Sequence, residues 1–379
     1  MKIVLAFDSF KGSLSASELN QIAQDAILSE LPEAEIQSIL LADGGEGTVD
    51  SLVGGLNGEI IQHEITNLNG DLISAKFGLA GNNCIIECAS SVGLSMSDMN
   101  NIELKTSYGM GQQIKYALDL GYRNFILGLG GSGTNDGGIG LLSALGYRFR
   151  DKLGNLLDAN LFNMQYITTI DFDEVDKRLS QAQFTVLSDV SNSLCGKNGA
   201  TFVYGIQKGI NQNQCALFDS YLANFSSVCV KEFGFDYSTH NGAGAAGGIG
   251  YSCLQFLSAK ITSGIDYILG AVNARQIIGE SDLIFTGEGK TDIQTLNGKL
   301  IAGVAKLAKQ FDKPVLVISG ALSSDAYRLH ENSIVYLSSI QDYPANLVDV
   351  IRPEITRILF YNRVKESIKL LRVGQALQD

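Results

Sequence analysis

A glycine-rich stretch, residues 128–140, carries groups well suited to hold a phosphate. It reads Gly-Leu-Gly-Gly-Ser-Gly-Thr-Asn-Asp-Gly-Gly-Ile-Gly and contains one amide side chain, Asn135, and one carboxylate, Asp136. Glycines let backbone N–H groups approach an anion, the N-terminus of a following helix attracts negative charge, and a carboxylate can ligate a divalent cation. Apolar runs at 125–127 and 141–145 flank the stretch. The pattern predicts a strand, a phosphate-binding loop and a helix.

Two other nucleotide-binding motifs match parts of the chain. Gly128, Gly130 and Gly133 satisfy the spacing of a dinucleotide-binding fingerprint. That fingerprint requires an acidic residue about 20 positions later at the end of a second strand. Asp151 lies near that distance, but in a polar segment that resembles a hairpin. An NAD-dependent dehydrogenase of a small hydroxy acid is therefore the alternative reading of this loop.

The second motif is the tail of a phosphate-binding Walker loop. Residues 289–291 read Gly-Lys-Thr and follow a strand-like run at 283–285. The leading glycine of the motif is missing, because Ile284 occupies its position. This reading is weaker than the first.

Length and composition indicate a protein of two domains. A chain of 379 residues exceeds what one hydrophobic core normally organises. No apolar stretch approaches the roughly 20 residues that a membrane-spanning helix needs. The chain reaches Asp8 too early for a signal peptide. We therefore expect a cytoplasmic protein that does not bind membranes.

Charge and cysteine content narrow the choice of partners. The formal net charge of −12 argues against nucleic acid and acidic membranes, since both require a concentrated positive surface. A small anionic substrate needs only a few local cations and backbone amides. Cys84 and Cys88 form a C-x-x-x-C pair, but no second pair or histidine cluster completes a zinc site. We expect buried free thiols.

Acidic residues recur where predicted strands end. Residues 3–7 form an apolar run that stops at Asp8, and residues 36–41 are predicted to form a second strand, which precedes Asp43. Between them, residues 15–18 make a capping box for a helix that reaches about residue 31. The carboxyl ends of parallel strands are where open α/β sheets bind ligands. We therefore expect Asp8 and Asp43 at the same edge of one sheet.

The chain changes character twice. After residue 58, β-like segments dominate, at 59–67, 72–79, 84–88 and 185–189, and from about residue 263 strands again alternate with helices. The predicted fold class is α/β with two domains. A Rossmann-like parallel-sheet domain is built from both chain ends, 1–58 and 263–379, and a second α/β domain with the glycine loops, 59–262, is inserted. A cleft between them is the expected place for chemistry.

Five segments together resemble the bacterial type I glycerate kinase family from end to end. They are residues 8–16, 42–48, 130–138, 242–248 and 286–289, the last with Asp292, Gln294 and Thr295. The resemblance implies an enzyme that phosphorylates D-glycerate from ATP with Mg²⁺, commonly giving 2-phosphoglycerate, with 3-phosphoglycerate as the other product. It also implies a Rossmann-like domain and a second α/β domain around the active site, and a monomer or homodimer.

Several positions depart from the family pattern. Gly133 stands where alanine is usual, Ser193 and Ile206 stand where prolines are frequent, and Asn241 stands where proline often precedes a glycine run. Fewer prolines suggest looser loops. Gln112 stands where glutamate is common, and it alone removes a charge. A role for an acid at that position is therefore in doubt.

Phosphoryl transfer depends on positioning and charge neutralisation, which directs attention to the acids, lysines and glycines of the motifs. The candidates for catalysis are Asp8, Lys11, Asp189 and Asp292. Those for binding ATP are Gly130, Gly131, Ser132, Asn135, Lys208, Gly287 and Glu288. Those for binding glycerate are Ser9, Lys11, Asp43 and Glu46, and those for binding Mg²⁺ are Asp136, Asp189 and Glu288.

Alternatives stay open for several of these residues. The base that accepts the glycerate proton is Asp8, Asp189 or Asp292. Asp43 and Glu46 could equally cap a helix, because acids are favoured at helix starts. Loop capping is likewise the alternative for each proposed metal ligand. The histidines, which lack partner motifs, are expected to be structural, and they are His63, His240 and His330.

Overall fold

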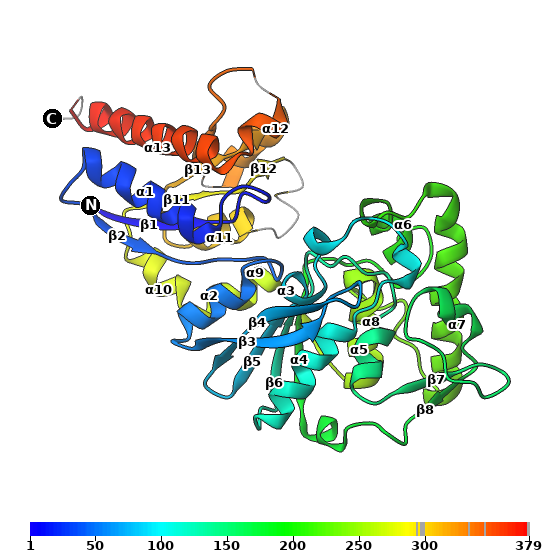
Figure 1. The fold of residues 1–379 in the computed structure, drawn as a ribbon. Coiled ribbons are helices and arrows are strands. Elements are labelled where there is room, and N and C mark those ends of the chain that lie inside the picture. The colour runs from blue at the N-terminus through cyan, green and yellow to red at the C-terminus, as the bar shows by residue number, and fades with distance from the viewer. Residues whose placement is uncertain (293–294, 296–299, 333, 345, 377–379) are drawn as a thin grey trace. The chain divides into compact units, whose positions relative to one another are not determined.

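The structure is a computed structural model that describes residues 1–292, 295, 300–332, 334–344 and 346–376. The chain divides into two compact units, which are coloured by residue number in Figure 1. Unit 1 comprises Met1–Ala42 and Ile265–Asp379, and unit 2 comprises Asp43–Gly264. The predicted α/β class, with one unit built from both chain ends and the other inserted, is confirmed.

Unit 1 is built on a parallel sheet of five strands in the order β15-β13-β11-β1-β2. The strands are β1 (Lys2–Phe7), β2 (Glu35–Ser38), β11 (Leu283–Gly287), β13 (Val315–Ser319) and β15 (Ile334–Ser339). Numbered along the chain, this order is 2-1-3-4-5, the flavodoxin-like version of a doubly wound sheet. Its topological switch point lies between β1 and β11. Ligands of such sheets bind beyond the carboxyl ends of the strands at that point.

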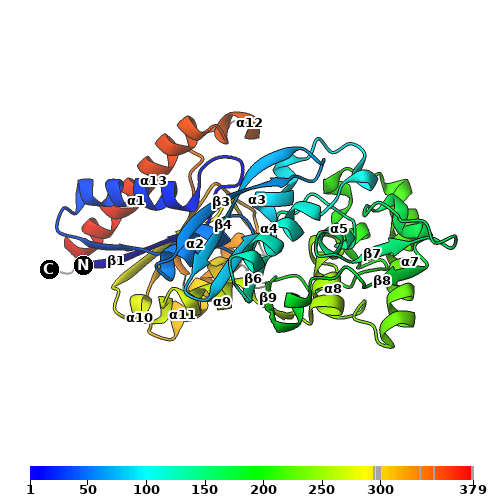
Figure 2. The same cartoon turned by 60° about the horizontal axis from the view of Figure 1, so that its bottom comes forward.

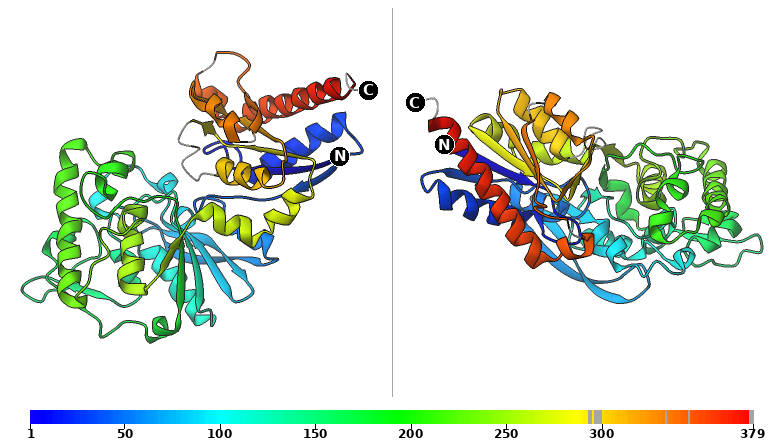
Figure 3. Two further views of the ribbon diagram at one scale, coloured as in Figure 1. Left: turned by 180° about the vertical axis from the view of Figure 1, so that it is seen from behind. Right: turned by 90° about the horizontal axis from the view of Figure 1, so that it is seen from above.

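Helices cover both faces of this sheet. On one face α1 (Ala16–Glu30) lies beside α13 (Pro353–Ala376), and both pack on alternate residues of β1, namely Ile3, Leu5 and Phe7. On the other face lies α11 (Leu300–Lys309), next to α10 (Ala274–Gly279) (Figure 3). The predicted capping box is confirmed, because the Ser15 side chain accepts the Glu18 N–H and Glu18 accepts the Ser15 N–H. This box fixes where α1 begins, just after the loop that follows β1.

Unit 2 has a mixed six-stranded sheet in the order β10-β9-β6-β5-β4-β3. The strands are β3 (Glu59–Thr66), β4 (Leu72–Ala80), β5 (Asn83–Glu87), β6 (Asn124–Gly128), β9 (Gln183–Leu187) and β10 (Lys260–Thr262). The first three are antiparallel neighbours, whereas β5, β6, β9 and β10 run parallel. Their carboxyl ends therefore meet at one edge, where the glycine loop after β6 lies.

The main helices of unit 2 are α2 (Thr48–Gly55), α4 (Tyr108–Asp119), α5 (Ile139–Ala144), α7 (Cys215–Phe233) and α8 (Ala245–Leu257). Helix α2 packs on β4 and β5 (Figure 2). Helices α4, α5 and α8 share one large hydrophobic core with the sheet. The shorter elements of unit 2 are α3 (Cys88–Val92), β7 (Arg148–Arg150), β8 (Thr169–Asp171) and α6 (Ala200–Tyr204). Those that follow in the chain are α9 (Gly264–Ala271), at the boundary, and β12 (Lys290–Thr291), β14 (Ala321–Leu322) and α12 (Leu347–Val350) of unit 1.

The boundaries between the units differ from those expected at 58/59 and 262/263. The structure divides the chain after Ala42 and after Gly264. The cause is α2, whose Val53 side chain packs so closely on β4 that a Cβ at Gly78 would lie 2.4 Å from it. Residues 43–58 therefore belong to unit 2. Asp43 nevertheless follows β2, which pairs in parallel with β1, so the expectation that Asp8 and Asp43 follow successive strands of one sheet is confirmed.

Among the described residues, no helix is both long and apolar enough to span a membrane. All six cysteines, which lie in the described part of the chain, are free thiols. Burial raises the pKa of Cys84 and Cys88, so both favour the neutral thiol. They pack as apolar side chains.

Candidate functional site

A cavity of about 190 Å³ opens in unit 2 at the edge where β6 and β9 end. Its wall includes six of the residues singled out in the sequence, which are Asp43, Gly130, Gly131, Ser132, Asp189 and Lys208. They come from three loops that are far apart in the chain and from the short turn 206–208. The parallel strands bring these loops together, because the loops after β6 and β9 leave neighbouring strands and the loop at 43–47 packs on the loop after β6.

Close backbone packing joins two of these loops. Gly130 donates its N–H to the carbonyl of Gly44 at 3.0 Å, and a Cβ at position 130 would lie 2.6 Å from the Gly45 Cα. The glycine at 130 therefore serves contact between the loops rather than donating its N–H to a ligand. Gly131 adopts a left-handed conformation, with φ of 77°, which glycine tolerates without strain. The loop thereby turns Gly131 and Ser132 to the cavity.

Lys208 is the buried cation of this cavity. Its side chain is 2% exposed, and its Nζ donates to the Ser132 Oγ at 2.9 Å and to the Thr134 carbonyl at 2.7 Å. Burial lowers the pKa of Lys208 to about 8. An ammonium has three N–H donors, so a third is left for a ligand in the cavity. An anion would both accept that bond and stabilise the charged form.

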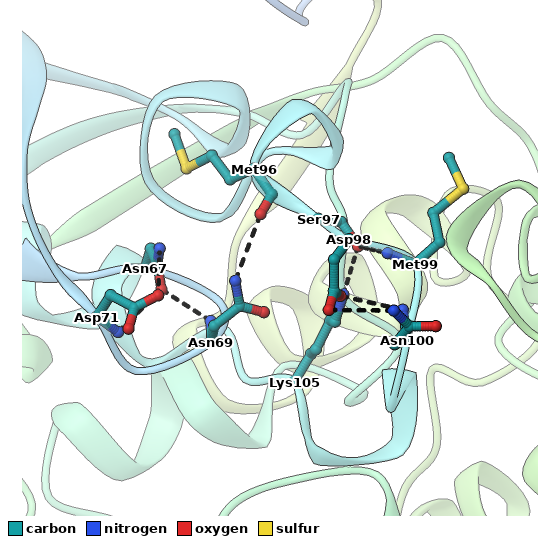
Figure 4. A network of polar contacts seen from close by, with 9 residues as sticks. All are labelled: Asn67, Asn69, Asp71, Met96, Ser97, Asp98, Met99, Asn100 and Lys105. Carbon is teal, nitrogen blue, oxygen red and sulfur yellow. Dashed lines mark hydrogen bonds and ion pairs between the residues drawn. The ribbon is translucent and has the colours of Figure 1, made fainter.

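A polar network holds the segment 97–105 (Figure 4). The buried Lys105 donates to the Ser97 Oγ at 2.5 Å and to the Asp98 carboxylate at 2.8 Å, and this hydrogen bond lowers the pKa of Asp98 to about 2. Met99, which lies between Asp98 and Lys105 in the chain, has a left-handed backbone conformation with φ of 61°. Its carbonyl lies against Gly209, where a Cβ would be only 2.1 Å away. The network thus supports the residue that follows Lys208.

Asp136 is placed as a loop cap. It is fully buried, and its two oxygens accept four hydrogen bonds, from the N–H and Oγ of Ser107 and the N–H groups of Gly138 and Gly140. It does not line the cavity. This arrangement fits the capping alternative, because both oxygens accept hydrogen bonds from the loops and the side chain lies away from the cavity wall. Burial raises its pKa, and the four donors oppose that shift.

Asn135 is also buried behind the loop. Its Nδ2 donates to the Thr201 Oγ1 at 2.9 Å, whereas its Oδ1 has no hydrogen-bond partner among the described residues. The side chain links the glycine loop to α6. This placement favours a supporting role over direct contact with a ligand in the cavity.

Asp189 and Asp43 supply the carboxylates of the cavity. Asp189 is exposed and accepts the Gly264 N–H at 3.1 Å. Asp43 is partly buried and accepts the N–H of Gly45 at 3.1 Å, so it also caps its own loop. Glu46 is exposed and is not part of the cavity wall. A carboxylate beside a lysine and a glycine loop is suited to a magnesium ion that keeps several waters, and Asp189 fits that role.

The remaining candidates lie in unit 1 at its topological switch point. Asp8 follows β1 and donates its backbone N–H to the carbonyl of Gly287, the last residue of β11. Gly287 lies so close to β13 that a Cβ would be 1.8 Å from the Ile318 carbonyl. Glu288 comes next, so two acids follow the two strands that flank the switch point. This is the place where the sheet rule expects a ligand.

Hydroxyl groups orient the acid after β11. The Oε1 of Glu288 accepts hydrogen bonds from Thr291 at 3.2 Å and from Thr295 at 2.6 Å. The Thr295 Oγ1 also accepts the N–H of Asp292. The sequence-matched residue Gln294 lies outside the described residues.

The loop after β1 brings Ser9 and Lys11 to the same end of the sheet. Ser9 donates its N–H to Asp8 at 2.7 Å, and Lys11 is exposed. A Cβ on Gly289 would lie 3.6 Å from the Lys11 N, so this loop and the loop after β11 are neighbours. Unit 1 therefore presents two acids, a hydroxyl and an exposed cation in one place.

The structure argues against both competing motifs. Lys290 and Thr291 form β12, which pairs with β14, and they do not open a helix as a Walker loop would. Asp151 caps a surface turn by accepting the N–H groups of Leu153 and Asn155, and it does not end a strand of the main sheet. The ribose-binding acid of the dinucleotide reading is therefore missing. Within the described ranges, no three His, Cys, Asp or Glu side chains cluster to hold a metal ion.

Comparison with known proteins decides the family. The model of the glycerate kinase family matches residues 3–367. The chain belongs to the glycerate kinase family. It is 40% identical over 344 residues to a glycerate kinase of Bacillus subtilis, covering 90% of each chain, and 37% identical over 344 residues to glycerate 2-kinase of Escherichia coli, again covering 90% of each. The resemblance stated from the motifs is confirmed.

A solved structure gives the same result. The crystal structure of a candidate glycerate kinase 2 from Salmonella typhimurium LT2 matches with a TM-score of 0.82 and 34% identity, covering 99% of both chains. Members of this family are phosphotransferases, and nothing in the comparisons supports the dehydrogenase alternative.

Sequence reasoning missed two residues of unit 2. Tyr204 lines the cavity and donates to Asn192 at 2.7 Å. Glu87 is a buried carboxylate at the end of β5. The signal for Glu87 was present, because an acid at a strand end is the pattern that singled out Asp8 and Asp189.

Proposed function

We propose that this chain catalyses the ATP-dependent, Mg²⁺-assisted phosphorylation of D-glycerate to 2-phosphoglycerate. Membership of the glycerate kinase family supports the reaction class, and the E. coli relative named glycerate 2-kinase favours the 2-hydroxyl. The observation that carries the proposal is Lys208, a buried cation with a donor to spare, beside a glycine loop and the carboxylate of Asp189. A phosphate is the ligand that such a set matches best.

The cavity of unit 2 binds the phosphates in this proposal. Lys208 and Ser132 donate to phosphate oxygens, and Gly131 allows the backbone to approach them. Asp189 holds the magnesium ion, which when bound neutralises phosphate charge. Asp136 is left out of the ligand set because its oxygens hold the loop. Asn135 supports the loop through Thr201.

The acids and the lysine of unit 1 serve the acceptor in this proposal. Lys11 and Ser9 bind the glycerate carboxylate, and Asp43 of unit 2 accepts a hydrogen bond from a glycerate hydroxyl. Asp8 or Asp292 takes the proton of the attacking hydroxyl. The new bond joins that oxygen to the γ-phosphorus, the bond to the β-phosphate oxygen breaks, and ADP leaves. That these residues share one cleft stays a prediction, as do a cytoplasmic location and a monomer or homodimer.

One incubation tests the reaction. The protein is mixed with D-glycerate, ATP and Mg²⁺, and the product is identified by ³¹P NMR and by its conversion with enolase, which accepts 2-phosphoglycerate. We expect ADP and 2-phosphoglycerate, and no turnover when EDTA removes the metal. A product that enolase rejects would move the reaction to the 3-hydroxyl. Formation of NADH from a hydroxy acid, without ADP, would refute the kinase assignment.

A further inference from the structure

Glu87 is a buried carboxylate that none of the roles above uses. It is the last residue of β5, opposite Gly128 of β6 in the sheet register, and its side chain is 1% exposed. It therefore occupies the same carboxyl edge as the glycine loop that follows β6. Burying a charge is costly unless hydrogen bonds compensate it, so its contacts are informative.

Those contacts are made to a different part of unit 2. The Oε2 of Glu87 accepts the backbone N–H of Val49 at 3.0 Å, and its Oε1 accepts the hydroxyl of Ser90 at 2.5 Å. The Nζ of Lys76 lies 4.0 Å from Oε1 and pairs more closely with Asp50, at 2.6 Å. Burial raises the pKa of Glu87, and the bonds from Ser90 and Val49 oppose that shift.

Val49 lies in the first turn of α2, which has no cap of its own. The N-cap residue is Gly47, in a left-handed conformation, and it provides no side-chain acceptor. The first N–H groups of a helix need acceptors from elsewhere. Glu87 supplies one of them from a neighbouring strand, and its negative charge is favourable at a helix N-terminus.

The loop that Glu87 fixes is the one that carries Asp43. Residues 43–47 run directly into α2, and the Thr48 hydroxyl donates to the Gly45 carbonyl at 2.7 Å. In turn Gly44 accepts the Gly130 N–H, and Asp43 lines the cavity. A continuous set of contacts thus leads from Glu87 through the start of α2 to the cavity wall.

We propose that Glu87 is a positioning residue that holds the 43–47 loop, and with it Asp43, in place for the acceptor substrate. Glu87 touches no ligand itself and acts through the N-terminus of α2. The inference rests on the proposed function for the role of Asp43. The claim about the loop stands apart from it, because loop order can be measured without turnover.

The test compares Glu87→Ala, Glu87→Gln and Lys76→Met. Hydrogen exchange by mass spectrometry follows the peptide that contains residues 43–49, and steady-state kinetics vary D-glycerate and ATP separately. Loss of one hydrogen bond to a charged group is worth about tenfold, so in Glu87→Ala we expect exchange of the Val49 amide to quicken by about that factor. The kcat/KM for D-glycerate should fall by about tenfold or more, and by more than the kcat/KM for ATP.

The other two variants separate positioning from general stability. Glu87→Gln keeps an oxygen for Val49, so exchange and kinetics should stay within about threefold of the wild type. Lys76→Met alters the charge beside Glu87 but leaves the Val49 bond, and it should leave residues 43–49 protected. Wild-type exchange in Glu87→Ala would overturn the proposal. So would an equal loss for both substrates in Glu87→Ala and Lys76→Met. If the wild-type protein does not phosphorylate D-glycerate, the proposed function fails while the exchange result still judges the role of Glu87.

Discussion

The two units build their polar sites in different ways. In unit 2 the cation, Lys208, is buried and tied to two acceptors, and glycines such as Gly130 let two loops pack backbone against backbone. In unit 1 the cation, Lys11, is exposed, and the carboxylate of Glu288 is oriented by the buried hydroxyl groups of two threonines. The cation of the first site is held by packing and hydrogen bonds, whereas the cation of the second site is exposed to solvent. Side chains of one type should therefore matter to different degrees in the two units.

The largest contrast is expected between the two lysines. Lys208→Met removes a buried cation that phosphate would contact, and we expect kcat/KM for ATP to fall by about a thousandfold. Lys11→Met removes an exposed charge, which water and salt partly screen, and the loss should be only about ten- to a hundredfold. Steady-state kinetics with both substrates measure the difference.

Circular dichroism melting serves as the control for the lysine pair. Lys208→Met removes two hydrogen bonds, which destabilises the fold, and it also removes the desolvation penalty of a buried charge, which stabilises it. Because the two effects oppose each other, the melting temperature should change little. If Lys11→Met lowered kcat/KM for ATP more than Lys208→Met, the cavity of unit 2 would not be the principal anion-binding site.

A second contrast concerns two buried acids. Asp136→Asn turns an amide N–H₂ towards backbone donors, so we expect a loss of about 3 kcal/mol in the free energy of unfolding. Glu288→Gln keeps an oxygen for Thr291 and Thr295, and its cost should stay below about 1 kcal/mol. Its activity should nevertheless fall by at least about tenfold, because the variant loses the charge of a predicted Mg²⁺ ligand. Urea unfolding and kinetics report the two effects. A stable Asp136→Asn protein that binds Mg²⁺ poorly would restore Asp136 as a metal ligand.

Glycines of the two units should also respond differently to an added methyl group. In Gly130→Ala the Cβ would meet the Gly45 Cα at 2.6 Å, and such overpacking costs about 1–3 kcal/mol. In Gly289→Ala the nearest atom is 3.6 Å away, an ordinary contact, so the free energy of unfolding should be nearly unchanged. Chemical denaturation of both variants makes the comparison. Equal stability of the two would mean that the loops of unit 2 can move apart freely.

The buried lysine also predicts a dependence on pH. The pKa of Lys208 is lowered to about 8 from its usual 10.5, so the free enzyme loses this cation above pH 8. The kcat/KM for ATP should then fall by up to about tenfold per pH unit. The unfolded chain binds more protons than the folded one between these two values, so stability should rise with pH across that window. Lys208→Met should lack both effects, and a pH profile identical to the wild type would contradict the assignment.

The sequence predicted most elements but not how they divide between the units. Apolar runs located β1 and β11 because fully buried parallel strands are continuous in hydrophobic residues. The expected boundary at 58/59 differs from the observed division after Ala42, because α2 packs on β4. The contact of Val53 with Gly78 joins residues that are far apart in the chain, so no pattern in the sequence reveals it. Asp136 was predicted to be a metal ligand because the sequence likewise does not show its distant hydrogen-bond partners. Only the fold reveals that Ser107, from a distant loop, satisfies it.

The smallest effect is expected at Gln112, where the family commonly has glutamate. Its Oε1 accepts both the N–H and the hydroxyl of Thr66, at 2.8 and 2.9 Å, and thereby ties α4 to the end of β3. A carboxylate oxygen would accept the same two bonds, and Gln112 does not line the cavity. Gln112→Glu should therefore change the free energy of unfolding by no more than about 0.5 kcal/mol and leave kcat/KM for both substrates unaltered. Gln112→Leu, which removes the acceptor but keeps the bulk, is the matched variant and should be less stable by about 1–2 kcal/mol. A clear gain in activity for Gln112→Glu would show instead that the acid acts on the reaction, and that its loss in this chain has a catalytic consequence.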